Sequence, residues 1–197
     1  MTVLGPASAV TRTAAAQSTD NAKWQAVRHA QDDWFDQIPG KHRLVFDTTE
    51  PNGLNSALLY ATNYYLANQS GYGLQNADLA VVVIARHFST PFAFNESIWA
   101  KYGTNIWSFI DKNKEPSKTN AYARQLNGFI ARGGHLAVCQ MASRALASMI
   151  AGSINSTEDE VMKEISSNLL PNSHLVSAGI VAVGRAQERG YALVSAV

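Results

Sequence analysis

The chain has 197 residues, of which 46% are hydrophobic, and this is enough for one domain with a substantial buried core. The net charge is +1 and only 16% of the residues are charged. No basic patch or acidic tail is present, so nucleic acid is not an expected partner. No apolar run approaches the ~18 residues that span a membrane, and we expect no membrane partner. The single cysteine excludes an internal disulfide and leaves the compartment open.

The amino-terminal residues differ in composition from the rest. Small residues dominate there, as in the cleavage region of an export signal, but a charged opening and a long apolar segment are missing. We interpret residues 1–23 as a disordered tail or the remnant of an export signal. A remnant would make the protein periplasmic or exported, and the alternative is cytoplasmic. Residues 24–197 are predicted to form a single domain, against which the aromatic residues Trp24, Trp34 and Phe35 pack.

Five short apolar segments are predicted to be strands. They cover residues 43–48, 79–85, 135–138, 174–177 and 191–196. The second reads Leu-Ala-Val-Val-Val-Ile-Ala, a continuous apolar run of the kind found in strands of parallel sheets that are covered on both faces.

Six segments carry apolar residues at helical spacing or a helix-start signal. They cover residues 54–68, 91–101, 122–132, 140–152, 157–170 and 180–189. Pro51-Asn52-Gly53 predicts a turn before the first helix. Pro91 is expected near the start of the second helix, and Gly152 at the end of the fourth. Residues 157–160 match a capping box, and the irregular stretch 103–118 predicts a loop or insertion.

Strands and helices alternate along the chain, which is typical of an α/β domain with a mainly parallel, five-stranded sheet. Neither a GxGxxG motif nor a Walker loop occurs, so no motif indicates nucleotide binding and no cofactor is predicted. The GxSxG signature of α/β hydrolases is also missing.

Cys139 lies where the strand at 135–138 gives way to the helix at 140–152. A thiol at the carboxyl end of a strand faces the first turn of the next helix, whose free N–H groups stabilise a thiolate. Arg144 would add positive potential if its side chain folds back. Cys139 is therefore a candidate reactive thiol, although a lone cysteine is often only a small buried hydrophobic residue.

Three segments carry a resemblance to a known family. They are Leu-Val-Phe-Asp-Thr-Thr at 44–49 with the Asn- and Ala-rich helix after it, Gly-Gly-His-Leu-Ala-Val-Cys at 133–139, and the closing stretch 169–193. The closing stretch ends in the pattern Gln-Glu-x-Gly-aromatic-x-Leu. On these segments, residues 42–197 resemble the DsrE/DsrF-like family of sulfur-relay proteins, in particular its exported members.

The resemblance implies a flavodoxin-like three-layer sandwich that assembles into homo-oligomers such as trimers or hexamers. It also implies that Cys139 carries sulfane sulfur as a persulfide, as a carrier or a sulfurtransferase. The partners would be sulfur donor and acceptor proteins or small sulfur anions. The alternative is a non-catalytic oligomeric binding or structural module in which Cys139 only packs.

Ligands of doubly wound sheets bind beyond the carboxyl ends of the strands. If the strand order is 2-1-3-4-5, Asp47 and Thr48 neighbour Cys139, and Arg86 and His87 lie one strand further along. Arg86 and His87 would bind an anion such as thiosulfate or stabilise a thiolate; the alternative is a solvated strand end. The predicted substrate-binding residues are thus Asp47, Thr48, Arg86, His87 and Arg144.

A metal site made of Cys139, His87 and His135 is conceivable. These residues lack the close spacing of a ligand motif, so no metal is predicted. Several aromatic residues on or near the predicted helices are interpreted as core or subunit-interface residues rather than as a ligand site. They are Tyr64, Tyr65, Phe92, Phe94 and Trp99.

Overall fold

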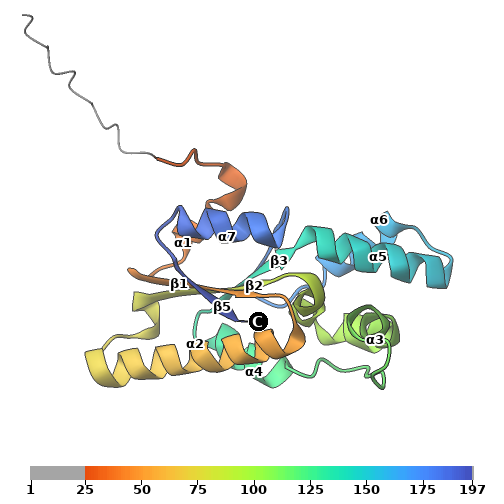
Figure 1. The fold of residues 1–197 in the computed structure, drawn as a ribbon, viewed down its shortest axis with the longest axis horizontal. Coiled ribbons are helices and arrows are strands. Elements are labelled where there is room, and N and C mark those ends of the chain that lie inside the picture. The colour runs from red at the N-terminus through yellow and green to blue at the C-terminus, as the bar shows by residue number, and fades with distance from the viewer. Residues whose placement is uncertain (1–24, 197) are drawn as a thin grey trace, which may run out of the picture.

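A five-stranded, all-parallel sheet forms the middle layer of the computed structural model, which describes residues 25–196. Its strands are β1 (His42–Thr48), β2 (Leu79–Ala85), β3 (His135–Cys139), β4 (Ser173–Val176) and β5 (Ala192–Ala196). Helices cover both faces, so the fold is a flavodoxin-like three-layer α/β sandwich (Figure 1). The predicted fold class and all five predicted strands are confirmed.

The central strand β2 explains why two helical layers are needed. All seven of its residues are buried. Because side chains alternate between the faces of a strand, Val81 and Val83 enter the larger core cluster, and Val82 and Ile84 enter the smaller one on the other face. The apolar run therefore lies inside the domain, as its composition predicted.

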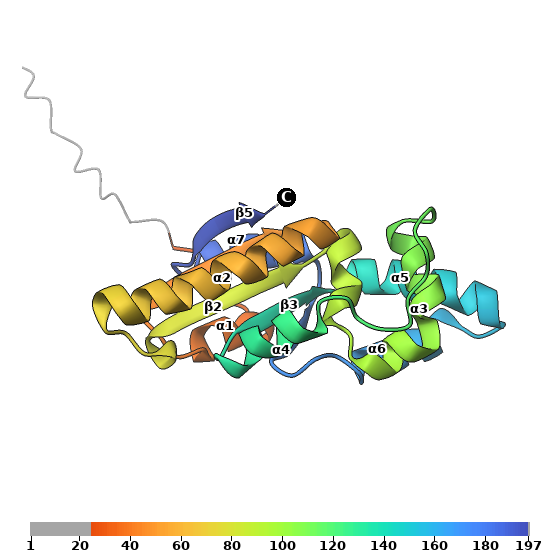
Figure 2. The ribbon, with the colours of Figure 1, turned by 90° about the horizontal axis from the view of Figure 1, so that it is seen from below.

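Five helices build the larger core. They are α2 (Pro51–Tyr72), α3 (Glu96–Ile110), α4 (Ala123–Ala131), α5 (Gln140–Ile154) and α6 (Glu158–Ser166). Helices α2 and α4 lie along the sheet, whereas α3, α5 and α6 gather beyond the carboxyl ends of the strands (Figure 2). None of the helices in residues 25–196 is both long and apolar enough to cross a membrane.

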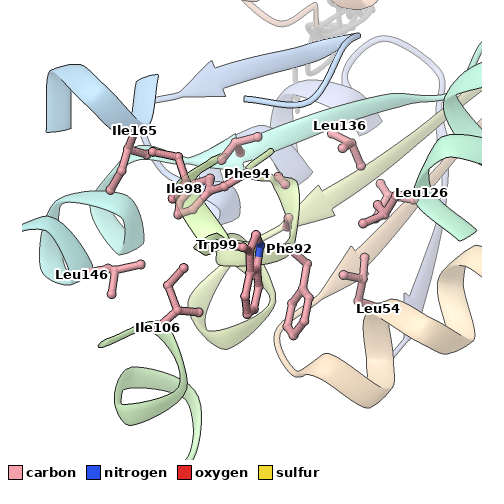
Figure 3. Packing of buried hydrophobic residues seen from close by; sticks show 14 of the residues in the cluster. Leu54, Phe92, Phe94, Ile98, Trp99, Ile106, Leu126, Leu136, Leu146 and Ile165 are labelled. Atoms are coloured by element: carbon pink, nitrogen blue, oxygen red, sulfur yellow. The ribbon is translucent and has the colours of Figure 1, made fainter. Parts of the chain in front are cut away.

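Aromatic side chains fill the junction between these two groups of helices. Phe92, Phe94 and Trp99 are fully buried there beside Leu54 and Ile106 (Figure 3). The buried indole N–H of Trp99 donates a hydrogen bond to the Pro91 carbonyl at 3.1 Å, so it is not left unsatisfied. The predicted core role holds for the whole aromatic set: Tyr65 is buried as well, and Tyr64 packs partly against the same cluster.

The second face is covered by α7 (Gly179–Gln187) and by the short helix α1 (Trp34–Gln37), which follows a 3-10 turn at Ala30–Asp32. The Tyr191 hydroxyl donates to the Phe35 carbonyl at 2.7 Å, and the buried Arg189 side chain donates to Asp36 at 3.0 Å. The prediction that Trp34 and Phe35 pack against the domain is thus confirmed. Trp24 and the predicted tail at 1–23 lie outside the described residues.

Two predicted helix starts are wrong. Pro51-Asn52-Gly53 forms the first turn of α2 rather than a separate turn, because a proline at the first helical position gives up no hydrogen bond. Pro91 lies inside the 3-10 helix His87–Ala93, and α3 begins only after Asn95. The Asn95 side chain accepts hydrogen bonds from the backbone N–H groups of Ser97 and Ile98, which makes it the helix cap.

The predicted loop at 103–118 is half helix, because α3 continues to Ile110. Gly103 faces the returning loop, and a Cβ there would lie 2.2 Å from the Ser117 carbonyl oxygen. Two predicted helix ends also differ. Helix α5 continues past Gly152 to a left-handed Asn155, and α6 begins at the predicted capping box but ends at Ser166, short of residue 170.

The strand order is β4-β3-β2-β1-β5, not 2-1-3-4-5. Strand β2 separates β1 from β3, so Asp47 and Thr48 are not on a strand adjacent to that of Cys139. The chain steps in one direction from β1 to β4, with its helices on the first face. It then returns through α7 on the second face to place β5 at the far side of β1 (Figure 1).

A histidine pair joins β3 and β4 near their amino ends. His135 Nδ1 and His174 Nε2 are 2.9 Å apart, and the His174 ring stacks on Trp34 with centroids 3.8 Å apart. Burial lowers the pKa of both rings. For His174, burial together with the nearby His135 lowers the pKa to about 4. Only one of the two rings can donate in this bond, so the pair fits neutral imidazoles.

We predict that this pair makes the fold sensitive to mild acid. Between pH 6.5 and about 4 an unfolded His174 binds a proton that the folded one does not. The free energy of unfolding therefore falls as the pH falls through this window, by on the order of 1–2 kcal/mol after allowance for partial exposure. Urea unfolding at several pH values measures this slope. His174→Gln should flatten it, and an unchanged slope in that variant would contradict the assignment.

Candidate functional site

Cys139 is the last residue of β3 and directly precedes α5. Its side chain is almost buried, with 6% of the residue exposed. The N–H groups of the first turn of α5 have no partner within the helix, and no side chain caps them. The junction predicted from the sequence is confirmed, and the thiol lies beside the positive end of a helix dipole.

A pocket of about 340 Å³ opens over Cys139. Three parts of the chain that are distant in sequence contribute to it: the turn after β2, the first two turns of α5, and the start of α7. Phe109 of α3 completes the lining. Phe88 and Phe109 meet edge to face, with centroids 5.5 Å apart. The walls are therefore mostly apolar.

The strand order explains why the pocket lies here. The helices that follow β1, β2 and β3 cover one face of the sheet, and the helix that follows β4 covers the other. Cys139 and Val176, at the carboxyl ends of β3 and β4, are register partners. A crevice opens where consecutive helices diverge to opposite faces. The site is thus at the carboxyl edge of the sheet as predicted, but it lies over the ends of β2 and β3, where the start of α7 closes it, and not between β1 and β3.

Two helix amino termini meet at this pocket. Met141 and Ala142 belong to the first turn of α5, and Gly179 and Ile180 to the first turn of α7. Helix α7 also lacks a side-chain cap. Both helices therefore direct the positive ends of their dipoles towards one space, which favours a negatively charged sulfur atom there.

Arg86 lines the pocket but is already paired. Its Nε donates to Asp47 Oδ1 at 2.7 Å and its Nη2 to Asp47 Oδ2 at 2.9 Å. The hydrogen bond to Asp47 raises the pKa of Arg86 against the opposing effect of burial, and attraction to Asp47 and to a Cys139 thiolate adds to the rise. The pair is largely shielded from solvent, with side chains 18% and 11% exposed. Arg86 was predicted to be free to bind an anion, but its charge is already neutralised by Asp47.

Gly179 makes room for the Arg86 stem. A Cβ at Gly179 would lie 2.5 Å from the Arg86 Cβ, closer than side chains approach. The start of α7 can therefore pack directly on the arginine, and this contact holds the guanidinium against Asp47. Glycine at the first position of α7 is in this way part of the site, which the sequence alone did not indicate.

Thr48 and His87 have different places. Thr48 is fully buried below the site; its hydroxyl donates to the Ile84 carbonyl at 2.8 Å and lies 2.9 Å from the Ser89 hydroxyl. Ser89 in turn accepts from the Arg86 backbone N–H at 3.0 Å. Thr48 therefore fixes the turn after β2 and does not line the pocket. His87 does line it, with a left-handed φ of 50°.

Arg144 is not part of the site. Its side chain is exposed and pairs with Glu158 at 2.9 Å and Asp159 at 3.3 Å, so it binds the first turn of α6 and does not fold back. The residues of the conceivable metal site do not come together either, because His135 and Cys139 lie at opposite ends of β3. Within residues 25–196, no three His, Cys, Asp or Glu side chains are grouped to hold a metal.

We predict that the Asp47–Arg86 pair matters for stability, unlike the pair at Arg144. Arg86→Ala leaves an almost buried carboxylate without its partner, which should cost about 2–4 kcal/mol of unfolding free energy. Arg144→Ala, which removes an exposed pair, should cost less than ~1 kcal/mol. Urea unfolding at neutral pH measures both. The double variant Asp47→Leu with Arg86→Met should recover most of the loss, and equal costs for the two alanine variants would refute the difference.

No protein-family model and no curated protein matches this sequence. Among solved structures, the chain is similar to MTH1491, a protein of unknown function from Methanobacterium thermoautotrophicum. The match has 17% sequence identity and a TM-score of 0.45, and it covers 79% of this chain and 99% of the other.

Proposed function

We propose that this protein carries sulfane sulfur as a persulfide on Cys139. The observation that supports this most is the position of the only cysteine in the chain: it lies in the wall of a pocket that two uncapped helix amino termini face. These termini stabilise the negative charge of a thiolate before reaction and of a persulfide after it. The resemblance to the DsrE/DsrF-like family points to the same chemistry.

The reaction needs no redox partner or cofactor. The Cys139 thiolate attacks the outer sulfur of a donor, a new S–S bond forms, and the bond between the outer sulfur and the donor breaks. The donor leaves with the electron pair of that bond. In the second half, an acceptor thiolate attacks the outer sulfur of the persulfide and regenerates the Cys139 thiolate. The two helix amino termini favour the anionic form of the sulfur in both halves.

The burial of Cys139 supports a second candidate. With 6% of the residue exposed, the thiol could serve only to pack β3 against α5, in a non-catalytic oligomeric binding module. The two candidates differ in one measurable property, which is whether a small electrophile reaches Cys139 in the native protein.

Cys139→Ser should abolish sulfur loading and leave the fold intact, because it removes little volume. Polysulfide or thiosulfate should add ~32 Da to Cys139 of the native protein, and a reductant should remove it. Intact-mass spectrometry measures this, with circular dichroism to confirm folding of the variant. A Cys139 that gains no sulfur mass and resists iodoacetamide would falsify the carrier proposal and support the packing role.

The proposed carrier is also a homo-oligomer, such as a trimer or hexamer. Three large apolar side chains of α2 support this because they are substantially exposed: Leu59, Tyr60 and Leu66. The neighbouring strand β5 pairs with β1 on one side only. We propose that another protomer covers this surface.

Light scattering at micromolar concentration tests the assembly. We expect a mass that is a multiple of 21.3 kDa, and Leu59→Glu together with Leu66→Glu should shift it towards the monomer. Met141→Gln, which changes an exposed residue elsewhere, serves as the matched control. A monomeric mass for the unmodified chain would argue against the assembly.

A further inference from the structure

The walls of the Cys139 pocket are suited to an apolar molecule. Phe88 and Phe109 form one side, and Ala145 lies in the second turn of α5. Met141 and Ile180, which also line the pocket, are 67% and 62% exposed. Large apolar side chains in the first turns of two helices thus contact both the pocket and the solvent. A contiguous apolar surface of this kind indicates a binding site.

The charges of the pocket suit such a molecule as well. Asp47 already neutralises Arg86 through two hydrogen bonds, and Arg144 is turned away towards α6. The two helix amino termini favour one negative sulfur atom next to Cys139. The walls offer no unpaired arginine or lysine to the oxygen atoms of an inorganic anion such as thiosulfate.

The size of the pocket leads to the same conclusion. A volume of about 340 Å³ lies within the range of ~300–1,000 Å³ that is usual for sites of small organic ligands. It corresponds to roughly ten water molecules at ~30 Å³ each. A small inorganic sulfur anion would leave most of that volume to water in contact with aromatic side chains, which is unfavourable.

We propose that the sulfur donor of this pocket is an organic hydropersulfide, RS–SH, whose R group is apolar. This inference rests on the proposed function, because it names the substrate of the same cysteine. The R group lies against Phe88, Phe109 and Ile180, and the terminal sulfur lies at Cys139 between the two helix amino termini.

The transfer balances without another reactant. The Cys139 thiolate bonds to the terminal sulfur, the RS–S bond breaks, and the thiolate RS⁻ departs with its electron pair. Cys139 becomes Cys–S–SH, which retains the proton of the donor. One sulfane sulfur moves between two thiols, so neither side is oxidised or reduced overall.

The test compares three donors on the full chain: hexyl hydropersulfide, 2-hydroxyethyl hydropersulfide and thiosulfate. The measured quantity is the second-order rate constant for gain of ~32 Da on Cys139. Burial of additional methylene groups should make the hexyl donor faster than the hydroxyethyl donor by about tenfold or more, and thiosulfate should be slowest. Equal rate constants would overturn the proposal and favour a protein donor that docks on the apolar rim. A fastest reaction with thiosulfate would overturn it in favour of an inorganic donor.

Variants locate the effect. Ile180→Gln should reduce the preference for the hexyl donor several-fold. Met141→Gln should do the same independently, so that one variant suffices if the other is poorly folded. Ile154→Gln changes an exposed isoleucine at the end of α5 that does not line this pocket, so it should leave the preference unchanged. A preference that survives both pocket variants would show that the R group binds elsewhere.

A binding measurement separates this inference from the proposed function. Cys139→Ser cannot accept sulfur, but its pocket should still bind 1-hexanethiol. Methyl NMR signals of Met141 and Ile180 should then shift on titration, whereas the methyl signals of Leu59 should not. If the unmodified protein gains no sulfur from any donor while the Cys139→Ser variant shows these shifts, the carrier function is refuted and the apolar pocket is retained. Unshifted Met141 and Ile180 signals would refute the pocket assignment itself.

Discussion

The complete burial of β2 is the constraint on which the rest of the structure depends. A strand with apolar side chains on both faces must be covered twice. Among residues 25–196, the second face is covered by α7 and the segment around α1, so the chain must change sides after β4. That change makes α5 and α7 diverge from adjacent strand ends, and the divergence opens the pocket at Cys139. The site is a consequence of how the sheet is buried.

The Asp47–Arg86 pair determines how much charge the site offers to a ligand. A free arginine beside a cysteine would attract inorganic anions from solution. The bidentate pair instead supplies a fixed dipole that is held in place by Gly179 and by the Ser89 turn. The remaining lining is apolar, so recognition of a ligand must come mainly from shape and from burial of apolar surface. In the sulfur transfer that we propose, the electrostatic contribution is confined to the sulfur atoms.

Much of the fold could be predicted because strands are local apolar runs: residues 79–85 match β2 at both ends. Helix limits depend on neighbours outside the helix. Gly152 does not end α5, and α3 continues into the predicted loop as far as Ile110, where Gly103 allows Ser117 to pack against the helix. Cys139 could be placed from its junction. The ion pair of Arg144 and the contribution of Phe109 and Ile180 to the pocket could not be predicted, because both depend on which face of the sheet each helix covers.

The hydrogen bonds that hold the amino-terminal segment have a consequence for the order of folding. Asp36 and Phe35 bind Arg189 and Tyr191, which follow them by 153 and 156 positions in the sequence. During synthesis the segment cannot dock until these late residues have left the ribosome. The second face of the sheet, including Val82 and Ile84, therefore stays uncovered until α7 and the residues that follow it have been synthesised. Contacts of such long range slow folding, and the nascent chain needs protection from aggregation during this interval.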